Sequence, residues 1–208
     1  MDNKKNFLIL SLVLVMLLGG AYMLYDRLSS SLDADRLAVN QPQSSSAAAG
    51  ETASESVSSN AEEPEPQNVK APDFTVYDAE GDEVHLTDFV GKPIVLNFWA
   101  SWCGPCKMEM PDFNEKYLEL GEEINFLMVN MTTGRETKEK AMEFIGEAGY
   151  AFPVFYDTQS DAAMTYGAYS LPTTFFIDAE GNAIAQAVGA IDGATLQRGI
   201  DLIYSKTE

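Results

Sequence analysis

Hydrophobic and polar positions divide the chain into three parts. Residues 7–25 carry no charged side chain, and this length is close to the roughly 20 residues that a helix needs to cross a bilayer. Residues 26–70 are rich in Ser, Ala, Glu, Gln and Pro and nearly lack large apolar side chains, which predicts a flexible linker. From residue 71 the apolar positions return at strand and helix spacing, which predicts one folded domain over residues 71–208.

Charges on either side of the apolar run predict its orientation. Lys4 and Lys5 precede it, whereas Asp26 and Arg27 follow it, so the positive-inside rule places residues 1–6 in the cytoplasm. A cleaved signal peptide is the alternative, but its apolar region is usually only about 7–15 residues long. We therefore expect a transmembrane anchor, a single-pass protein of the cell membrane and an extracytoplasmic C-terminal domain.

Strands and helices alternate within the predicted domain. Strands are predicted over residues 74–77, 84–86, 94–99, 124–130, 174–177 and 183–188, and helices over residues 104–121, 137–148, 161–166 and 192–204. The third strand is a continuous apolar run with one polar interruption, as expected for a central strand covered on both faces, and the fourth is predicted to be a second buried strand. The helix between them predicts that they are parallel, and the last two strands flank a turn, which predicts an antiparallel hairpin. The fold class is therefore α/β, a central mixed sheet flanked by helices, with an N-terminal β-hairpin extension.

Charge and cysteine content narrow the possible functions. The net charge of −19 would repel phosphate backbones, so no nucleic-acid partner is expected. The only cysteines are Cys103 and Cys106, so neither is spare for a structural disulfide elsewhere. The pair must therefore have its own explanation.

Three other uses of a Cys-x-x-Cys pair fit poorly. Haem attachment needs a histidine directly after the second cysteine, where this chain has Lys107. A structural zinc site needs four ligands, but His85 is the sole histidine and there is no second cysteine pair. A structural disulfide across so short a loop would contribute only about 2 kcal/mol. Redox chemistry by the cysteines themselves is favoured, with no metal and no cofactor.

The position of the pair predicts the role of each thiol. Cys103 lies where a central strand passes into a helix, and the positive end of the helix dipole stabilises a thiolate there. Cys103 is therefore predicted to attack, and Cys106, one turn further along, to resolve the mixed disulfide. Gly104 leaves the sulfur accessible, and Pro105 fits the first helical turn because its missing N–H costs nothing there.

Resolution requires Cys106 to lose its proton. On a helix Glu109 lies three residues after Cys106, on the same face, so its carboxylate is the predicted proton acceptor and catalytic acid–base group. The alternative is an ordinary exposed glutamate.

Four separated motifs resemble the membrane-anchored TlpA/ResA branch of the thioredoxin superfamily. Residues 99–107 (Trp-Ala-Ser-Trp-Cys-Gly-Pro-Cys-Lys) resemble the thioredoxin active-site motif. Ala-Pro-Asp-Phe at residues 71–74, Leu-Asn-Phe-Trp at residues 96–99 and Leu-Pro-Thr-Thr at residues 171–174 occur in the family's order. The resemblance covers about residues 71–203 and implies a thioredoxin fold.

This resemblance implies a substrate-binding surface. In the family the proline matching Pro172 is cis and lies against the cysteine pair, and the residue before it, here Leu171, offers backbone hydrogen bonds to an extended substrate. Trp102, Gly104 and Pro105 complete the expected surface. A trans proline in a turn before a strand is the alternative.

The resemblance also implies the direction of electron transfer and the partners of the protein. Thioredoxins have a buried aspartate where this chain has Asn97, whereas ResA-like proteins place the functional acid at the position of Glu109. The Gly-Pro dipeptide resembles that of reducing thioredoxins. Members of this branch reduce disulfides outside the membrane, notably in apocytochrome c, and receive electrons from an integral-membrane thiol relay. We expect a disulfide-containing protein substrate, such a donor and a monomer.

Three other functions remain open. Within the same chemistry, the protein could donate electrons to an extracytoplasmic methionine sulfoxide reductase. A thiol peroxidase would share the fold, but residues 97–103 lack the Pro-x-x-x-Thr-x-x-Cys pattern of peroxiredoxins. A non-catalytic thioredoxin-like binding module would not need the intact cysteine pair.

Overall fold

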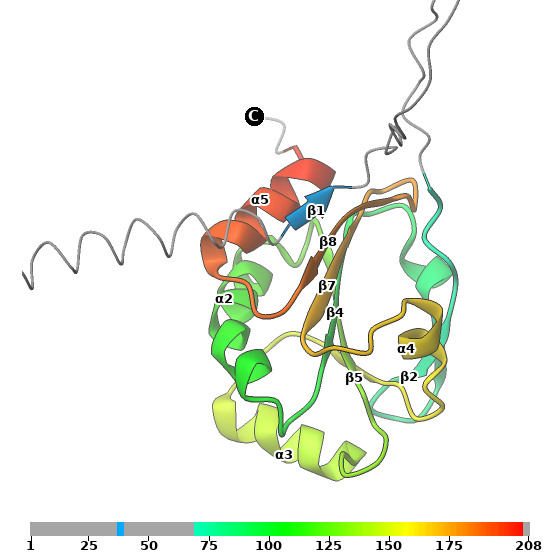
Figure 1. Cartoon of the computed structure of the whole chain (residues 1–208), viewed down its shortest axis with the longest axis vertical. Coiled ribbons are helices and arrows are strands. Elements are labelled where there is room, and N and C mark those ends of the chain that lie inside the picture. Colours follow the sequence, from blue (N-terminus) through cyan, green and yellow to red (C-terminus); the bar gives the residue numbers. More distant parts are fainter. Residues whose placement is uncertain (1–36, 40–68, 206–208) are drawn as a thin grey trace, which may run out of the picture.

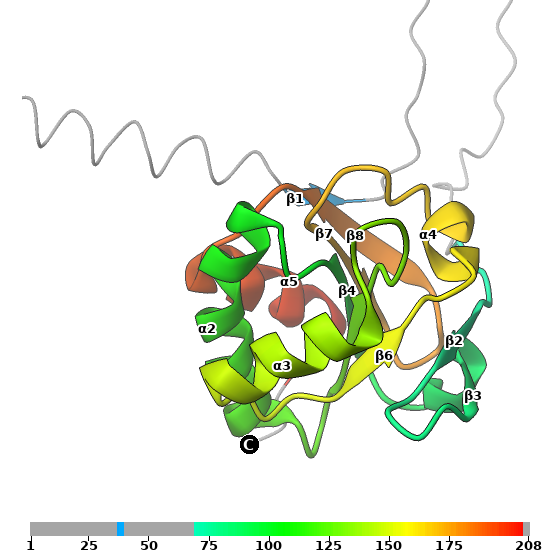
Figure 2. The same cartoon turned by 90° about the horizontal axis from the view of Figure 1, so that it is seen from below.

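A mixed sheet with helices on both faces forms the centre of the fold (Figures 1 and 2). The computed structural model describes residues 37–39 and 69–205. The strands are β1 (Leu37–Val39), β2 (Thr75–Tyr77), β3 (Glu83–His85), β4 (Ile94–Trp99), β5 (Asn125–Asn130), β6 (Val154–Tyr156), β7 (Thr173–Ile177) and β8 (Ala183–Val188). The helices are η1 (Leu86–Phe89), α2 (Gly104–Leu120), α3 (Lys138–Ala148), α4 (Asp161–Thr165) and α5 (Gly193–Ile203).

The strand order is β1-β8-β7-β4-β5-β6-β2-β3. β4 and β5 are parallel, β7 and β8 form an antiparallel hairpin beside them, and the hairpin β2–β3 extends the sheet beyond β6. The sequence predictions of a parallel central pair, a C-terminal hairpin and an N-terminal hairpin extension are confirmed, and each predicted element is found within a few residues of its expected bounds. The thioredoxin-like α/β fold is therefore confirmed.

β4 separates two hydrophobic cores because its side chains alternate between the faces of the sheet. Val95 and Trp99 belong to the core that includes residues of α2, α3 and α5. The other core, on the side of α4 and β2, contains the alternate residues Ile94, Leu96 and Phe98. Figure 2 shows α2, α3 and α5 on one side of the sheet and α4 on the other. Asn97 has the same parity as Val95 and Trp99, so its buried amide faces α2.

Three short elements were not predicted, namely η1, β6 and β1. η1 and β6 have only four and three residues, which is too short to show a hydrophobic period. β1 differs from an explicit prediction. Residues 37–39 lie inside the region 26–70 that was expected to be a flexible linker, but they form β1, which pairs antiparallel with β8. The physical reason is that β8 would otherwise present an unpaired edge. The N–H and C=O groups of this edge can form hydrogen bonds with the backbone of a short extended segment, whatever its hydrophobic pattern. The prediction is therefore wrong for these residues.

Other N-terminal predictions lie outside the described residues. These are the cytoplasmic residues 1–6, the anchor over residues 7–25 and the rest of the linker. Within residues 37–39 and 69–205, the helices are too short or too polar to span a bilayer.

Candidate active site

The two cysteines lie where β4 passes into α2. Cys103 is the N-cap of α2 and is joined to Cys106 by a disulfide, with 5.3 Å between their Cα atoms. The Cys106 backbone N–H points at the Cys103 Sγ over 3.2 Å, because the first turn of a helix leaves its N–H groups without backbone acceptors. Gly104 and Pro105 form the first turn, as predicted.

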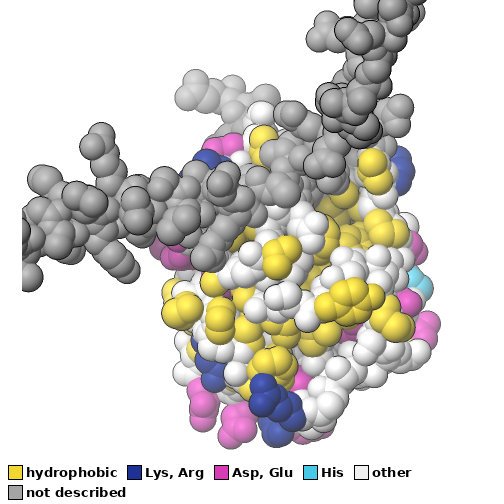
Figure 3. Space-filling model, viewed as in Figure 1, with side chains coloured by type: hydrophobic (Ala, Val, Ile, Leu, Met, Phe, Trp, Pro, Cys, Tyr) yellow, Lys and Arg dark blue, Asp and Glu magenta, His cyan; other side chains and the backbone are white. Residues whose placement is uncertain are grey.

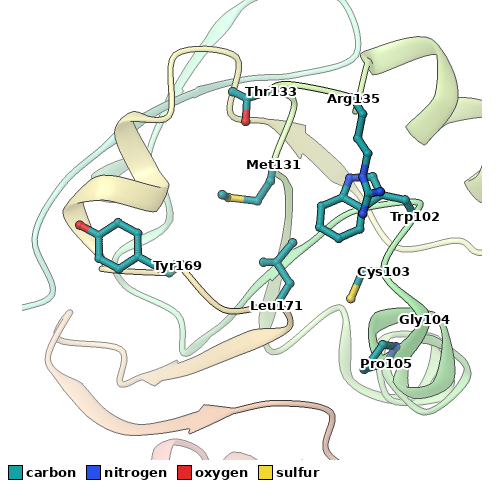
Figure 4. A pocket seen from close by; sticks show the side chains of 10 residues that line it. Trp102, Cys103, Gly104, Pro105, Met131, Thr133, Arg135, Tyr169 and Leu171 are labelled. Atoms are coloured by element: carbon teal, nitrogen blue, oxygen red, sulfur yellow. The ribbon is translucent and has the colours of Figure 1, made fainter.

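Cys103 and Cys106 differ in how accessible they are to a partner molecule. Cys106 is fully buried in the α2-side core, whereas Cys103, 4% exposed, lines a surface pocket of about 450 Å³. Figure 4 shows the Cys103 sulfur directed into this pocket. Its lining residues are Trp102, Cys103, Gly104, Pro105, Met131, Thr133, Arg135, Ala168, Tyr169 and Leu171. A partner molecule can therefore approach Cys103 and not Cys106.

Leu171 and Pro172 close one side of the site. The Leu171–Pro172 peptide bond is cis, as the family resemblance implied. The Pro172 carbonyl accepts a hydrogen bond from the Gly189 N–H over 2.9 Å, and the Leu171 backbone makes no hydrogen bond to any other described residue. The backbone of Leu171 is thus free at the pocket wall.

Glu109 is buried beneath the cysteine pair, so the alternative of an exposed glutamate is wrong. Only 2% of its surface is exposed. The Asn97 Nδ2 donates to Glu109 Oε1 over 2.8 Å, and the Ile191 backbone N–H donates to Oε2 over 3.0 Å. Asn97 Nδ2 also donates to Thr174 Oγ1 over 3.0 Å. Residues from β4, β7 and the loop before α5 therefore fix the carboxyl group.

Burial sets the acidity of this carboxyl group. Removal from water raises the pKa of Glu109 from 4.5 to about 7, because the charged form loses its hydration. The hydrogen bonds from Ile191 and Asn97 oppose this rise, since they stabilise the carboxylate, and the nearby Asp112 adds to it. A group with this pKa can both accept and release a proton near neutral pH.

The loop between β5 and α3 forms the opposite wall of the pocket. Arg135 places its guanidinium carbon 3.9 Å from the centroid of the Trp102 ring, and Figure 4 shows the two side chains together beside Cys103. The neighbouring Glu136 is buried. Its carboxylate accepts hydrogen bonds from the Ser101 N–H at 2.8 Å, the Ser101 hydroxyl at 2.7 Å and the Asn130 Nδ2 at 2.9 Å. Glu136 therefore ties this loop to the segment that carries Cys103.

Sequence reasoning did not find Arg135, Glu136 or Tyr169. A signal was present for the first two, because they follow β5, and the carboxyl ends of the parallel strands β4 and β5 meet at one edge of the sheet. Tyr169, 85% exposed, has no such signal because it lies in an irregular loop after α4. In the described part of the chain, no group of three or more His, Cys, Asp or Glu side chains is placed to hold a metal.

A thioredoxin-like sheet with a disulfide between the N-cap and the first turn of a central helix defines a class of protein, the thioredoxin-fold redox proteins. Comparison with known proteins then gives the family. The chain belongs to the AhpC/TSA family, whose model matches residues 68–186. Its relatives place it within the ResA-like part of the thioredoxin superfamily.

Two curated relatives carry the same name. "Thiol-disulfide oxidoreductase ResA" of Bacillus thuringiensis (strain Al Hakam) is 42% identical over 123 residues, which are 58% of this chain and 68% of the relative. The ResA protein of Geobacillus thermodenitrificans is 37% identical over 134 residues, 64% of this chain and 75% of the relative. A solved structure described as a thiol:disulfide interchange protein DsbE from Chlorobium tepidum matches with a TM-score of 0.57 and 32% identity, over 64% of this chain and 94% of that chain. The protein is a thiol-disulfide oxidoreductase.

Proposed function

We propose that the protein is a membrane-anchored, extracytoplasmic reductant of protein disulfides, in which Cys103 attacks and Cys106 resolves. The observation that carries this proposal is the unequal access of the two cysteines. Cys103 lines a surface pocket, whereas Cys106 is fully buried above an acid whose pKa is about 7. The Gly104-Pro105 dipeptide, which resembles that of reducing thioredoxins, supports the reducing direction.

In the reduced protein, the Cys103 thiolate attacks one sulfur of the substrate disulfide. The substrate S–S bond breaks, a mixed disulfide with Cys103 forms, and the other substrate sulfur leaves as a thiolate. The Cys106 thiolate then attacks the Cys103 sulfur and releases the first substrate sulfur. Two electrons pass to the substrate, whose thiolates take up two protons, and the protein is left with the Cys103–Cys106 disulfide.

The proposed role of Glu109 is to accept the proton of Cys106. It lies one helical turn from Cys106 on the same helix, and burial removes competing water from both groups. A pKa of about 7 allows the carboxylate to take this proton near neutral pH. The free backbone of Leu171 would hold the substrate as an extended segment beside Cys103, as in β-strand addition.

The membrane location and partners rest on the sequence and the family. The uncharged run at residues 7–25 and the preceding lysines support an anchor with the domain outside. The choice of an apocytochrome c disulfide as substrate, and of an integral-membrane thiol protein as electron donor, rests on the resemblance of the four motifs to the TlpA/ResA branch. A peroxidase receives less support, because the Pro-x-x-x-Thr-x-x-Cys pattern does not precede Cys103.

The test is to express Cys106→Ser in the native membrane and isolate mixed disulfides. Attack by Cys103 should proceed and resolution should fail, so substrate should accumulate on Cys103. Cys103→Ser is the matched control and should trap nothing. The reduction potential should lie near the value of about −270 mV found for thioredoxin, and a value near about −120 mV would instead indicate an oxidant. Absence of any trapped species in Cys106→Ser would refute the proposed order of attack.

A further inference from the structure

The charge of the pocket differs from that of the chain as a whole. The chain has 32 acidic and 13 basic side chains, yet the pocket beside Cys103 is lined by one charged residue, Arg135, and by no carboxylate. An acidic protein that places a lone cation beside its reactive sulfur creates a local site for negative charge.

Among the residues that the structure describes, the guanidinium of Arg135 has no acidic partner at contact distance. Within the described residues no carboxylate lies within 4.0 Å of it. The adjacent Glu136 makes no ion pair with it, and its buried carboxylate instead accepts hydrogen bonds from Ser101 and Asn130. The Arg135 carbonyl accepts from Lys140 Nζ over 2.7 Å, which helps to fix the loop.

The Trp102 ring holds the guanidinium in place. The distance of 3.9 Å from the guanidinium carbon to the ring centroid is that of a cation–π contact, which restrains the side chain without using its N–H donors as a salt bridge would. Those donors remain available to a planar, bidentate acceptor such as a carboxylate.

The rest of the pocket fits a polypeptide. Trp102 is 46% and Tyr169 is 85% exposed, and Met131 and Leu171 add apolar surface between them. Figure 3 shows hydrophobic side chains gathered on this face, with a basic group at its lower end and acidic groups toward its edges. Exposed apolar surface beside a free backbone segment suits an extended chain with apolar side chains.

We propose that Arg135 is a specificity-determining residue, which binds the carboxylate of an Asp or Glu next to the cysteine that Cys103 attacks. The substrate class is therefore a disulfide-bonded segment with an acidic residue beside its cysteine and an apolar residue against Trp102. This inference rests on the proposed function, because it names the substrate of the same site. Arg135 selects the substrate and takes no part in the exchange of electrons or protons.

The test uses the full chain, kept in a mild detergent and reduced, with three disulfide-bonded peptides. The peptides are identical except for Glu, Gln or Lys next to the attacked cysteine. Wild type should reduce the Glu peptide about fivefold faster than the Gln peptide at limiting concentration, the size of a favourable exposed ion pair. The Lys peptide should be slower still, and the preference should shrink as salt is added.

Four variants separate the possible causes. In Arg135→Gln the ratio of the Glu to the Gln peptide should fall to near unity, and in Arg135→Glu the Lys peptide should become the preferred one. Arg135→Lys should keep part of the preference, since it retains the charge but loses the planar fork. Lys116→Gln removes the same charge from the far part of α2 and should keep the full preference.

A second measurement is independent of reduction. Versions of the peptides with serine in place of cysteine are titrated onto the oxidised chain, with Trp102 fluorescence as the signal, and the acidic peptide should bind more tightly to wild type only. If Arg135→Gln slows all three peptides equally and keeps their ratio, the residue acts on the Cys103 thiolate and the inference is wrong. If wild type reduces no peptide, the proposed function fails, and the titration still decides whether Arg135 binds the acidic side chain.

Discussion

Replacing Glu109 by Gln should change how the stability of the oxidised protein depends on pH. The folded protein holds the Glu109 proton more tightly than the unfolded chain does, because burial raises the pKa from 4.5 to about 7. The stability from this group is therefore fully present below pH 4.5 and is lost as the pH rises through about 7. Gln does not titrate, so the variant lacks this loss.

The magnitude follows from the two pKa values. Each pKa unit corresponds to about 1.36 kcal/mol. Wild type should therefore lose roughly 3 kcal/mol of unfolding free energy relative to Glu109→Gln between pH 4.5 and pH 8. Gln has a single acceptor oxygen, so one of the two donors, Asn97 Nδ2 or the Ile191 N–H, loses its acceptor, which costs about 1–3 kcal/mol at every pH. The variant is thus expected to be the less stable protein in acid, and the gap should narrow or reverse in base.

The assay is urea unfolding of residues 34–208, which include every described element, in oxidising buffer at half-unit steps from pH 4.5 to 8. Fluorescence of the buried Trp99 reports the transition. Glu115→Gln, an exposed position of the same helix, is the matched control and should follow wild type. If the Glu109→Gln curve also runs parallel to wild type over the whole range, the carboxyl group does not titrate as its burial requires. The assignment of Glu109 as proton acceptor would then lose its physical basis.

Two further predictions concern the loop and the edge strand. Glu136→Ala should lower the unfolding free energy by about 3 kcal/mol, because the buried amide of Asn130 and the part-buried donors of Ser101 lose their acceptor. A loss below about 1 kcal/mol in urea unfolding would contradict this. Deletion of residues 37–39 should speed the hydrogen exchange of those backbone amides of residues 185–187 that point toward β1. The amides of β8 that are hydrogen-bonded to β7 should stay protected. Unchanged exchange across β8 would mean that β1 contributes no protection.

The central part of the site could be predicted because local rules determine it. A continuous apolar run fixed β4, and the helical period placed α2 directly after it, so the Cys103 position at the helix start followed from the chain alone. The spacing of Glu109 to Cys106 on one helix face predicted it as the proton acceptor, but the same spacing also fitted an exposed glutamate, so its burial became known only from the structure. These features depend on residues close together in sequence, where periodicity carries information.

The remaining features depend on tertiary structure. The Ile191 N–H meets Glu109 across 82 positions of sequence, and no local pattern signals such a contact. The Arg135–Trp102 contact depends on the path of an irregular loop, which hydrophobic period does not encode. β1 is three residues long, too short to show a period, and it exists because an edge of the sheet was available.

The arrangement separates the two requirements of disulfide exchange. Proton transfer near neutral pH requires an acid with a raised pKa, and burial in the core between β4 and α2, beside Cys106, supplies it at Glu109. Substrate recognition requires an accessible surface, and the loops at the carboxyl ends of β4 and β5 supply it around Cys103 and Arg135. The disulfide spans the boundary between these two environments. Changes at Glu109 should therefore alter the pH dependence of stability and exchange without altering substrate preference. Changes at Arg135 should alter substrate preference without altering the pH dependence. Measuring both properties in both variants tests whether the two functions are separable.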